Sequence, residues 1–308
     1  MFIRQFEYLV ALAQTEHFGR AATQCHVSQS GLSNAIRQLE EELGAAIVLR
    51  DHRFQGFTAE GARIVEWARR FIGDLDMMRQ ELSMMKGNLT GQLRIGAMPS
   101  CSPILPFITS ALTQRYPAVT VNICFLGIDE LRRRVLNFEL DLGIGYLNLL
   151  GSSQIAMRLL YSDDMALLVP SKPNFPRNKS ATWTEAAALP LCLLPRSMEE
   201  RRIVDAVFAA EGLDVMPRIE ADSFVNLAFH VMHGHYATII AGHFRYVTGA
   251  FPGTRILRLV SPSIQQQIGL FWFESEPVLP LIHALIGMLD RMDEEQAPWL
   301  SRPEARGR

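Results

Sequence analysis

The chain is poor in the features that mark membrane proteins, disulfide scaffolds and zinc-binding domains. No apolar run approaches the ~20 residues of a membrane-spanning helix, and the first residues, Met-Phe-Ile-Arg-Gln-Phe-Glu, lack the apolar core of a secretory signal. The 308 residues include only 4 cysteines and no Cys-x-x-Cys pair, which argues against a disulfide framework and a zinc ribbon. We therefore expect a protein that stays in the cytoplasm.

The sequence also lacks an excess of positive charge. Its formal net charge is -2, from 30 Lys and Arg against 32 Asp and Glu. A chain of this balance binds nucleic acid only if its basic side chains are gathered on one face and its acids are turned away. Such weak basicity also favours binding by two linked copies. With 48% hydrophobic residues, the chain is long enough for two or three domains.

One segment has the pattern of two short helices that cross closely. Ala21 and Ala22 are small, as a close crossing requires, and Ser28 is a good N-cap for the second helix. Apolar side chains then recur at spacings of four and three residues from Leu32 to Leu39, which predicts a packed face. The opposite face suits the major groove of DNA, although a solvated helical hairpin would show the same pattern. That face carries Gln29, Ser30, Ser33, Asn34 and Arg37.

Two short β-prone runs around a polar turn follow, between residues 47 and 58, and they are typical of a wing. Arg50 and Arg53 stand where a wing meets DNA phosphates, and Thr58 caps the next helix with Gly61 three residues on. From Ala21 to Gly61 the spacing and the residue types resemble those of LysR-type transcriptional regulators. The resemblance implies a winged helix-turn-helix that binds double-stranded operator DNA.

Residues 59 to 87 are predicted to form one long helix with an apolar stripe at three- and four-residue spacings. At 1.5 Å per residue such a helix is about 40 Å long, which favours a coiled-coil-like partner over burial within the first domain. The resemblance implies the same, a linker helix that pairs two subunits. Gly87 to Gly91 then ends the helix as a hinge. The stripe consists of Ile64, Trp67, Ala68, Phe71, Leu75, Met78, Leu82 and Met85.

After Gly91, strands alternate with helices, which predicts α/β architecture. The pattern resembles a periplasmic-binding-protein-like module of two lobes, with crossovers near residues 161–164 and 266–269. The predicted fold is thus an N-terminal winged helix-turn-helix, a long linker helix and a two-lobed α/β effector domain. The expected bounds are 1–58 for the DNA-binding domain, 59–90 for the linker and 91–300 for the effector domain. Lobe I is expected over about 91–162 and 268–300, and lobe II over about 163–267.

Ligands of such sheets sit beyond the carboxyl ends of strands, near helix N-termini that favour anions. The turn from Met98 to Pro103 gathers two hydroxyls and a thiol at such a place, although plain helix capping explains the same serines. We expect a small effector that is anionic and partly apolar. The expected contacts are Ser100, Cys101, Ser102, Ile128, Arg196, Ser223 and Phe224.

Two other sensing chemistries compete with this interpretation. A helix N-terminus lowers thiol pKa, so Cys101 is a candidate peroxide-sensing thiol in a redox regulator of the same architecture. The histidines between His230 and His243 are a weaker candidate for a metal site, because no cysteine or carboxylate has matching spacing.

We expect no catalytic set, no metal and no cofactor. The sequence thus predicts an effector-responsive regulator rather than an enzyme. It is expected to be a dimer through the linker helix, and the resemblance to LysR-type regulators implies a tetramer through the effector domains. RNA polymerase is a candidate partner, and no membrane association is expected.

Overall fold

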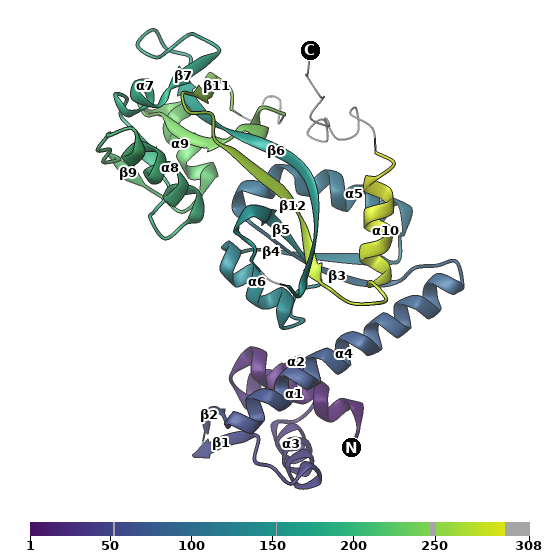
Figure 1. Cartoon of the computed structure of the whole chain (residues 1–308). Helices are drawn as coiled ribbons and strands as arrows, with labels where there is room; N and C mark the ends of the chain where they lie inside the picture. The colour runs from purple at the N-terminus through teal and green to yellow at the C-terminus, as the bar shows by residue number, and fades with distance from the viewer. Residues whose placement is uncertain (52, 152, 247–250, 293–308) are drawn as a thin grey trace. The chain divides into compact units, whose positions relative to one another are not determined.

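The computed structural model describes residues 1–308 apart from 52, 152, 247–250 and 293–308 (Figure 1). The chain forms two compact units. One comprises residues 1–91, with the short segments 136–139 and 279–281, and the other comprises the remainder. We call residues 1–91 the head and the second unit the module. No helix in the described ranges is long and apolar enough to cross a membrane.

The head is helical with a small two-stranded sheet. Three of its helices pack around one apolar core, and a fourth, longer helix contributes Val65 and Ala68 to the same core. Ala21 is completely buried and Ala22 is 3% exposed, which confirms the close crossing predicted from their size. In chain order the elements are α1 (Ile3–Thr15), α2 (Phe18–Gln24), α3 (Gln29–Leu43), β1 (Val48–Asp51), β2 (Arg53–Phe57) and α4 (Ala59–Met85).

Gly61 explains the Thr-x-x-Gly pattern at the start of α4. The Gly61 amide donates to Thr58 Oγ1 (2.8 Å), and the Thr58 hydroxyl donates to the Ala46 carbonyl (2.6 Å). A Cβ atom on Gly61 would lie only 2.0 Å from the Ile47 carbonyl oxygen. Only glycine therefore lets α4 approach the strand that leads into the wing.

The module is built on an eight-stranded sheet of order β4-β3-β5-β12-β6-β11-β7, with β10 paired to β6. Its first elements are β3 (Gly91–Ala97), η1 (Pro99–Ile104), α5 (Leu105–Arg115), β4 (Val119–Phe125), α6 (Ile128–Leu136), β5 (Leu142–Tyr146) and η2 (Leu147–Leu149). Then come β6 (Ile155–Pro170), β7 (Ser180–Thr182), α7 (Trp183–Ala187), β8 (Cys192–Leu193), α8 (Glu199–Ala210), β9 (Ile219–Glu220) and α9 (Phe224–His233). The chain closes with β10 (Thr238–Ala241), η3 (Gly242–Tyr246), β11 (Thr254–Val260), β12 (Gln265–Phe273) and α10 (Pro280–Leu289).

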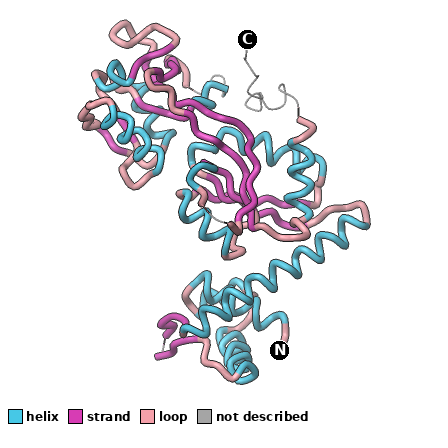
Figure 2. Tube along the Cα trace, in the orientation of Figure 1, coloured by secondary structure: helices cyan, strands magenta, loops and turns pink. Residues whose placement is uncertain are grey.

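Two long antiparallel strands, β6 and β12, run through both lobes of the module (Figure 2). Lobe I contains β3, β4 and β5, and lobe II contains β7, β10 and β11. The pairing of β12 with β6 runs from Gln265 opposite Asp164 to Phe273 opposite Ile155. The predicted crossovers at 161–164 and 266–269 lie within this pairing. The sequence pattern singled out neither the first half of β6 nor β11 as a strand.

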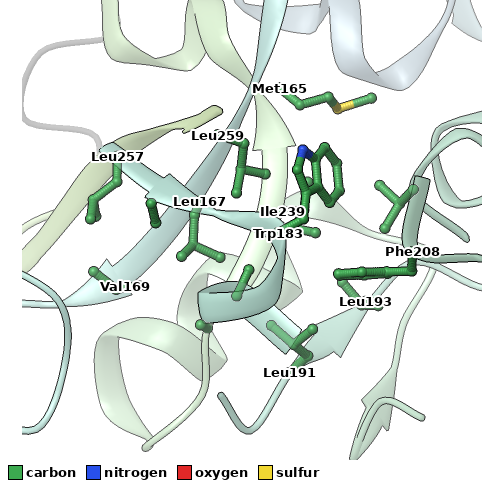
Figure 3. Close-up of a cluster of buried hydrophobic side chains, with 14 of the residues drawn as sticks. Met165, Leu167, Val169, Trp183, Leu191, Leu193, Phe208, Ile239, Leu257 and Leu259 are labelled. Atoms are coloured by element: carbon green, nitrogen blue, oxygen red, sulfur yellow. The ribbon is translucent and has the colours of Figure 1, made fainter. Parts of the chain in front are cut away.

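Lobe II has its own apolar core, which fixes the helices that line the cleft. Trp183 is completely buried and lies edge-on to Phe208, with ring centroids 5.4 Å apart (Figure 3). The Trp183 indole Nε1 donates to the Pro262 carbonyl (2.8 Å), so the polar group of this buried ring has a hydrogen-bond partner. Phe208 comes from α8, and this contact holds α8 against the sheet.

Candidate functional sites

The first candidate site is the exposed face of α3 in the head. The Gly31 amide donates to Ser28 Oγ (3.1 Å), which caps the helix as expected. Leu32, Ile36 and Leu39 are completely buried. Opposite them, Ser33 is half-buried, and the remaining predicted contacts, Gln29, Ser30, Asn34 and Arg37, are exposed.

This face carries hydrogen-bonding groups that are already partly ordered. Arg37 Nη1 donates to Asn34 Oδ1 (3.3 Å), which restricts both side chains without burying either. Ser28 and Ser30 hydroxyl groups lie 3.2 Å apart. Exposed, short polar side chains on a rigid helix are what direct readout of base edges in the major groove requires.

The antiparallel pair β1–β2 occupies the place of the predicted wing. Val48 pairs with Phe57 in this hairpin. The side chains of Arg50 and Arg53 lie outside the described part of the structure, so their expected phosphate contacts stay predictions. Glu40 Oε1 accepts from the amides of Ile47 (2.9 Å) and Val48 (3.0 Å). This acid thus ties the wing to α3.

The second candidate site is the cleft between the two lobes of the module, where η1 follows β3. His243 Nε2 lies 2.7 Å from the Ser100 carbonyl oxygen, and Nδ1 lies 2.7 Å from Asp163 Oδ2 and 3.3 Å from the Tyr161 hydroxyl. A carbonyl only accepts hydrogen bonds, so Nε2 carries a proton. The Nδ1–Asp163 contact holds a second proton. This buried chain links η1 of lobe I to β6 and η3, and the sequence gave no indication of it.

Beside this chain, Ser100, Tyr146 and Glu200 form a buried polar cluster. Ser100 has no exposed surface, Tyr146 is 1% exposed and Glu200 is 5% exposed. Burial raises the pKa of the Glu200 carboxyl, and the nearby Ser100 hydroxyl lowers it by less. Ser100 Oγ and Glu200 Oε1 have no hydrogen-bond partner among the described residues. Glu200 reads in the sequence as an ordinary acid in the first turn of a helix, which is why it was missed.

One hollow adjoins the cluster, and a second opens farther out in the module. The deeper has a volume of ≈ 10 Å³ and is lined by Tyr146, Glu200 and Arg201 together with apolar side chains that include Phe224 and Ile239. The outer pocket has a volume of ≈ 310 Å³. It is lined by Ser102, Pro103, Val225, Ala228, Phe229, Met232, Phe244 and Phe251. The deeper hollow has both polar and apolar walls, as the site of a small amphipathic ligand does, and the outer pocket is largely apolar.

The other predicted effector contacts do not line either hollow. Ile128 is 4% exposed and packs over Gly145 of β5. Ser223 is exposed and caps α9, because its Oγ accepts from the Asn226 amide (3.3 Å). The Arg196 side chain is 73% exposed and pairs with Asp205 (3.2 Å). The structure thus brings Ser100, Cys101 and Phe224 together in the cleft, with Ser102 in the outer pocket.

The expectation of a low thiol pKa at Cys101 is wrong. Cys101 is completely buried, and this burial raises its pKa well above the usual value. η1 is a six-residue 3-10 helix, so the dipole on which the expectation rested is too short to oppose burial. Burial likewise raises the pKa of Cys192 to about 11.

The histidines do not converge either. His243 belongs to the buried chain with Asp163, whereas His230 and His233 lie on α9. Within the described residues no three His, Cys, Asp or Glu side chains gather as a metal site would require.

Comparison with known proteins bears on both sites. The bacterial regulatory helix-turn-helix profile of the LysR family matches residues 3–62, and the LysR substrate binding domain profile matches residues 86–293. The DNA-binding transcriptional dual regulator OxyR of Escherichia coli K12 is 28% identical over 280 residues, covering 90% of this chain and 91% of that protein.

Two solved structures share the fold. Full-length OxyR from Pseudomonas aeruginosa, in a variant form, has a TM-score of 0.73 at 24% identity and covers 94% of each chain. CbnR in complex with its target DNA has a TM-score of 0.64 at 20% identity, covering 94% of this chain and 99% of that one.

Proposed function

Because this chain belongs to the LysR family of bacterial transcriptional regulators, we propose that it binds an operator through α3 and the wing and responds to a small molecule held beside Ser100. The observation that carries the proposal is the buried cluster of Ser100, Tyr146 and Glu200, with two unpartnered atoms next to a cavity. Buried polar groups in native proteins are nearly always paired, and exceptions mark functional places.

Base readout is proposed for the exposed side chains of α3. Their helix is held rigid by three fully buried apolar residues, which favours precise contacts. Phosphate contacts are proposed for Arg50 and Arg53, whose role is to position the head without specifying sequence. Replacing Ser33 with Ala is expected to relax operator preference in competition binding assays. An unchanged ratio of specific to random DNA affinity would contradict this assignment.

The division of labour that we propose is 1–58 for DNA binding, 59–90 for dimerisation and 91–300 for effector binding. Support for dimerisation comes from the part of α4 beyond the head core. Trp67 is 61% exposed, Leu82 is 50% exposed and Met85 is 84% exposed, an apolar stripe typical of a helix that awaits a partner. A tetramer would form through the modules, as the family resemblance implies.

Charging this stripe tests the dimer. Leu82→Asp is expected to yield monomers in light scattering, because burying an unpaired carboxylate at a helix interface is strongly unfavourable. Phe71 is a poorer choice because its ring also packs on Phe6 of α1, with centroids 5.4 Å apart. A native-size oligomer for Leu82→Asp would mean that subunits pair elsewhere.

The cleft assignment is tested on the full chain. A thermal-shift screen of small metabolites identifies ligands, because a ligand bound only by the folded state raises its stability. Ser100→Phe is expected to keep operator binding and lose the response to such a ligand. Ser110→Phe, at an exposed position of α5, is the matched control and should respond normally. A normal response in Ser100→Phe would contradict the site.

A redox regulator is the second candidate. It is favoured by the relatives, several of which are hydrogen peroxide-inducible genes activators. Against it, Cys101 and Cys192 are buried, and burial raises the pKa of both thiols, so little thiolate is available to react. Mass spectrometry after mild peroxide treatment decides: selective oxidation of Cys101 in the folded protein would favour the redox alternative.

The similar proteins are regulators. We propose that this chain likewise performs no catalysis and acts in the cytoplasm, where its operator lies. A change in the spacing of the DNA-bound heads would then alter transcription by RNA polymerase. The effector shifts that arrangement only by its difference in affinity for the alternative states.

A further inference from the structure

The charge of Glu200 at the inner end of the cleft is not balanced by the nearby Arg201. Arg201 lines the same cavity as Glu200, but its guanidinium group is taken up elsewhere. Arg201 Nε donates to Asp205 Oδ1 (2.7 Å), and Nη1 donates to the Leu194 carbonyl (2.7 Å) and to Glu220 Oε1 (2.7 Å). Among the residues that the structure describes, none forms an ion pair with Glu200.

Two other acids nearby are balanced within the protein, since Glu199 pairs with Arg202 and Asp163 pairs with His243. Asp163 is bound to His243 Nδ1, and one proton lies between them. Whether the imidazole or the carboxyl holds this proton, the net charge of the pair is zero. An ionised Glu200 would therefore give the inner cleft one uncompensated negative charge. A bound anion would meet that charge at close range, whereas a cation would neutralise it.

The two unpartnered atoms also favour a donor. A carboxylate oxygen only accepts hydrogen bonds, and a serine hydroxyl can accept as well as donate. An ammonium group has three donors on one small atom, and the ≈ 10 Å³ cavity has room for a single group of about that size. Apart from Arg201, the remaining wall is apolar and aromatic, with Phe224, Met165 and Ile239. Aromatic faces stabilise a desolvated cation.

We infer that the effector of this protein is an amine, whose ammonium group bridges Glu200 Oε1 and Ser100 Oγ while its apolar body lies against Phe224 and extends toward the outer pocket. This inference rests on the proposed function, because it names the chemical class of ligand for the same cleft. It departs from the anionic effector expected from the sequence, since the polar groups that meet here are acceptors and one is an acid.

The experiment uses the full chain and three probes with one skeleton: benzylamine, benzyl alcohol and benzoate. Isothermal titration and thermal melts are expected to detect benzylamine binding, weaker binding of benzyl alcohol and none of benzoate. Glu200→Gln should weaken benzylamine binding roughly tenfold or more, the effect of losing a charge-assisted hydrogen bond. Benzyl alcohol binding should change little. Glu211→Gln, an exposed acid at the end of α8, is the matched control and should bind all three as wild type does.

Proton release gives a second readout that a merely structural role of Glu200 would not produce. Burial raises the pKa of Glu200 in the empty cleft, and an ammonium group would hold it ionised. Benzylamine titrations in buffers of different ionisation enthalpy, repeated from pH 4 to pH 7, should therefore show protons leaving the wild-type protein at the pH values where the empty cleft keeps Glu200 protonated. Glu200→Gln should release none.

The outcomes separate this inference from the function on which it rests. Benzoate binding that exceeds benzylamine binding and is lost in Ser100→Phe overturns the amine class and leaves the effector cleft standing. Benzylamine binding that is unchanged in Glu200→Gln, or absent across propylamine, butylamine and benzylamine, also overturns it, and the cavity then holds only water. A ligand that alters operator binding equally in wild type and Ser100→Phe overturns the proposed cleft itself.

Discussion

In the head, α3 presents Asn34 and Arg37 to solvent above a largely apolar core, whereas in the module Ser100 and Glu200 are buried between two lobes. In the proposed function, the head reads a large, charged and hydrated partner, so its side chains must be reachable and its rigidity comes mainly from packing. The module would read a small partner, and burial strengthens each polar contact that such a partner makes. One chain thus uses exposure at one site and desolvation at the other.

The largest expected effect comes from disturbing the close packing of the head. Gly61→Ala places a Cβ 2.0 Å from the Ile47 carbonyl oxygen, although alanine is the better helix former. We expect the head to lose about 3 kcal/mol or more of stability and operator binding with it. Gly127→Ala in the module, where a Cβ would meet nothing within 4 Å, is the control. Hydrogen exchange measures the protection of the head amides in both variants. Equal protection would contradict a clash at residue 61 as the cause of the lost stability.

A slightly smaller effect is expected from the buried chain in the module. Asp163→Ala leaves His243 buried without its partner and should cost about 3 kcal/mol, as breaking buried pairs does. Asp164→Ala removes a neighbouring acid that pairs with a 58% exposed Arg258, and should cost under about 1 kcal/mol. Denaturant unfolding of both variants checks the contrast. Similar losses would mean that burial does not distinguish these two acids.

Glu200→Gln tests the burial of Glu200 through the pH dependence of stability. Burial raises the pKa of folded Glu200, so its contribution to stability is full below the unfolded pKa of about 4.3 and is lost as pH rises through the folded pKa. Glutamine does not titrate, so the variant loses this dependence of stability on pH. Above pH 7 the variant should exceed wild type by on the order of 1 kcal/mol in free energy of unfolding. Melts from pH 4 to pH 8 that run parallel for the two proteins would contradict the buried carboxyl.

The smallest effect concerns exposed acids. Glu130 accepts from Arg133 and Arg134, which lowers its pKa to about 2. Its contribution is present above the unfolded pKa and is lost as pH falls through about 2. Glu130→Gln should cost about 0.5 kcal/mol at pH 7 and clearly less at pH 2, where part of the Glu130 carboxyl is protonated, and Glu66→Gln in the head, with one partner, should cost less. Thermal melts at both pH values measure this, and a loss that was undiminished at pH 2 would exclude the ion pairs as its cause.

Much of the secondary structure follows from the sequence. The long helix expected over residues 59–87 is α4, which ends at residue 85, the second helix of the helix-turn-helix begins after Ser28 as expected, and strands alternate with helices after Gly91. Each has strong local periodicity or a cap. The first half of β6 was missed because Ser162 to Asp164 interrupt the apolar run and Met157 and Leu159 are exposed. Pairing with β12, about a hundred residues away, makes that segment a strand.

The candidate cleft was only partly predictable for a related reason. Ser100 and Phe224 each follow a short strand, which local patterns reveal. Glu200 looked like a solvated acid at a helix start, and His243 looked like one of several scattered histidines. Residues that are distant in the sequence surround each of these side chains, such as Asp163 on β6 beside His243. Spacing along the chain does not predict such contacts.

By itself, the sequence determined the helix-turn-helix, the long apolar helix and the α/β alternation, because side-chain size, capping and periodicity act within a few residues. Only the tertiary structure decided which polar groups are buried. Burial depends on the closing of lobes that are distant in the chain, and it turned Glu200 from a surface acid into a desolvated carboxyl and Cys101 from a candidate thiolate into a buried thiol with a raised pKa.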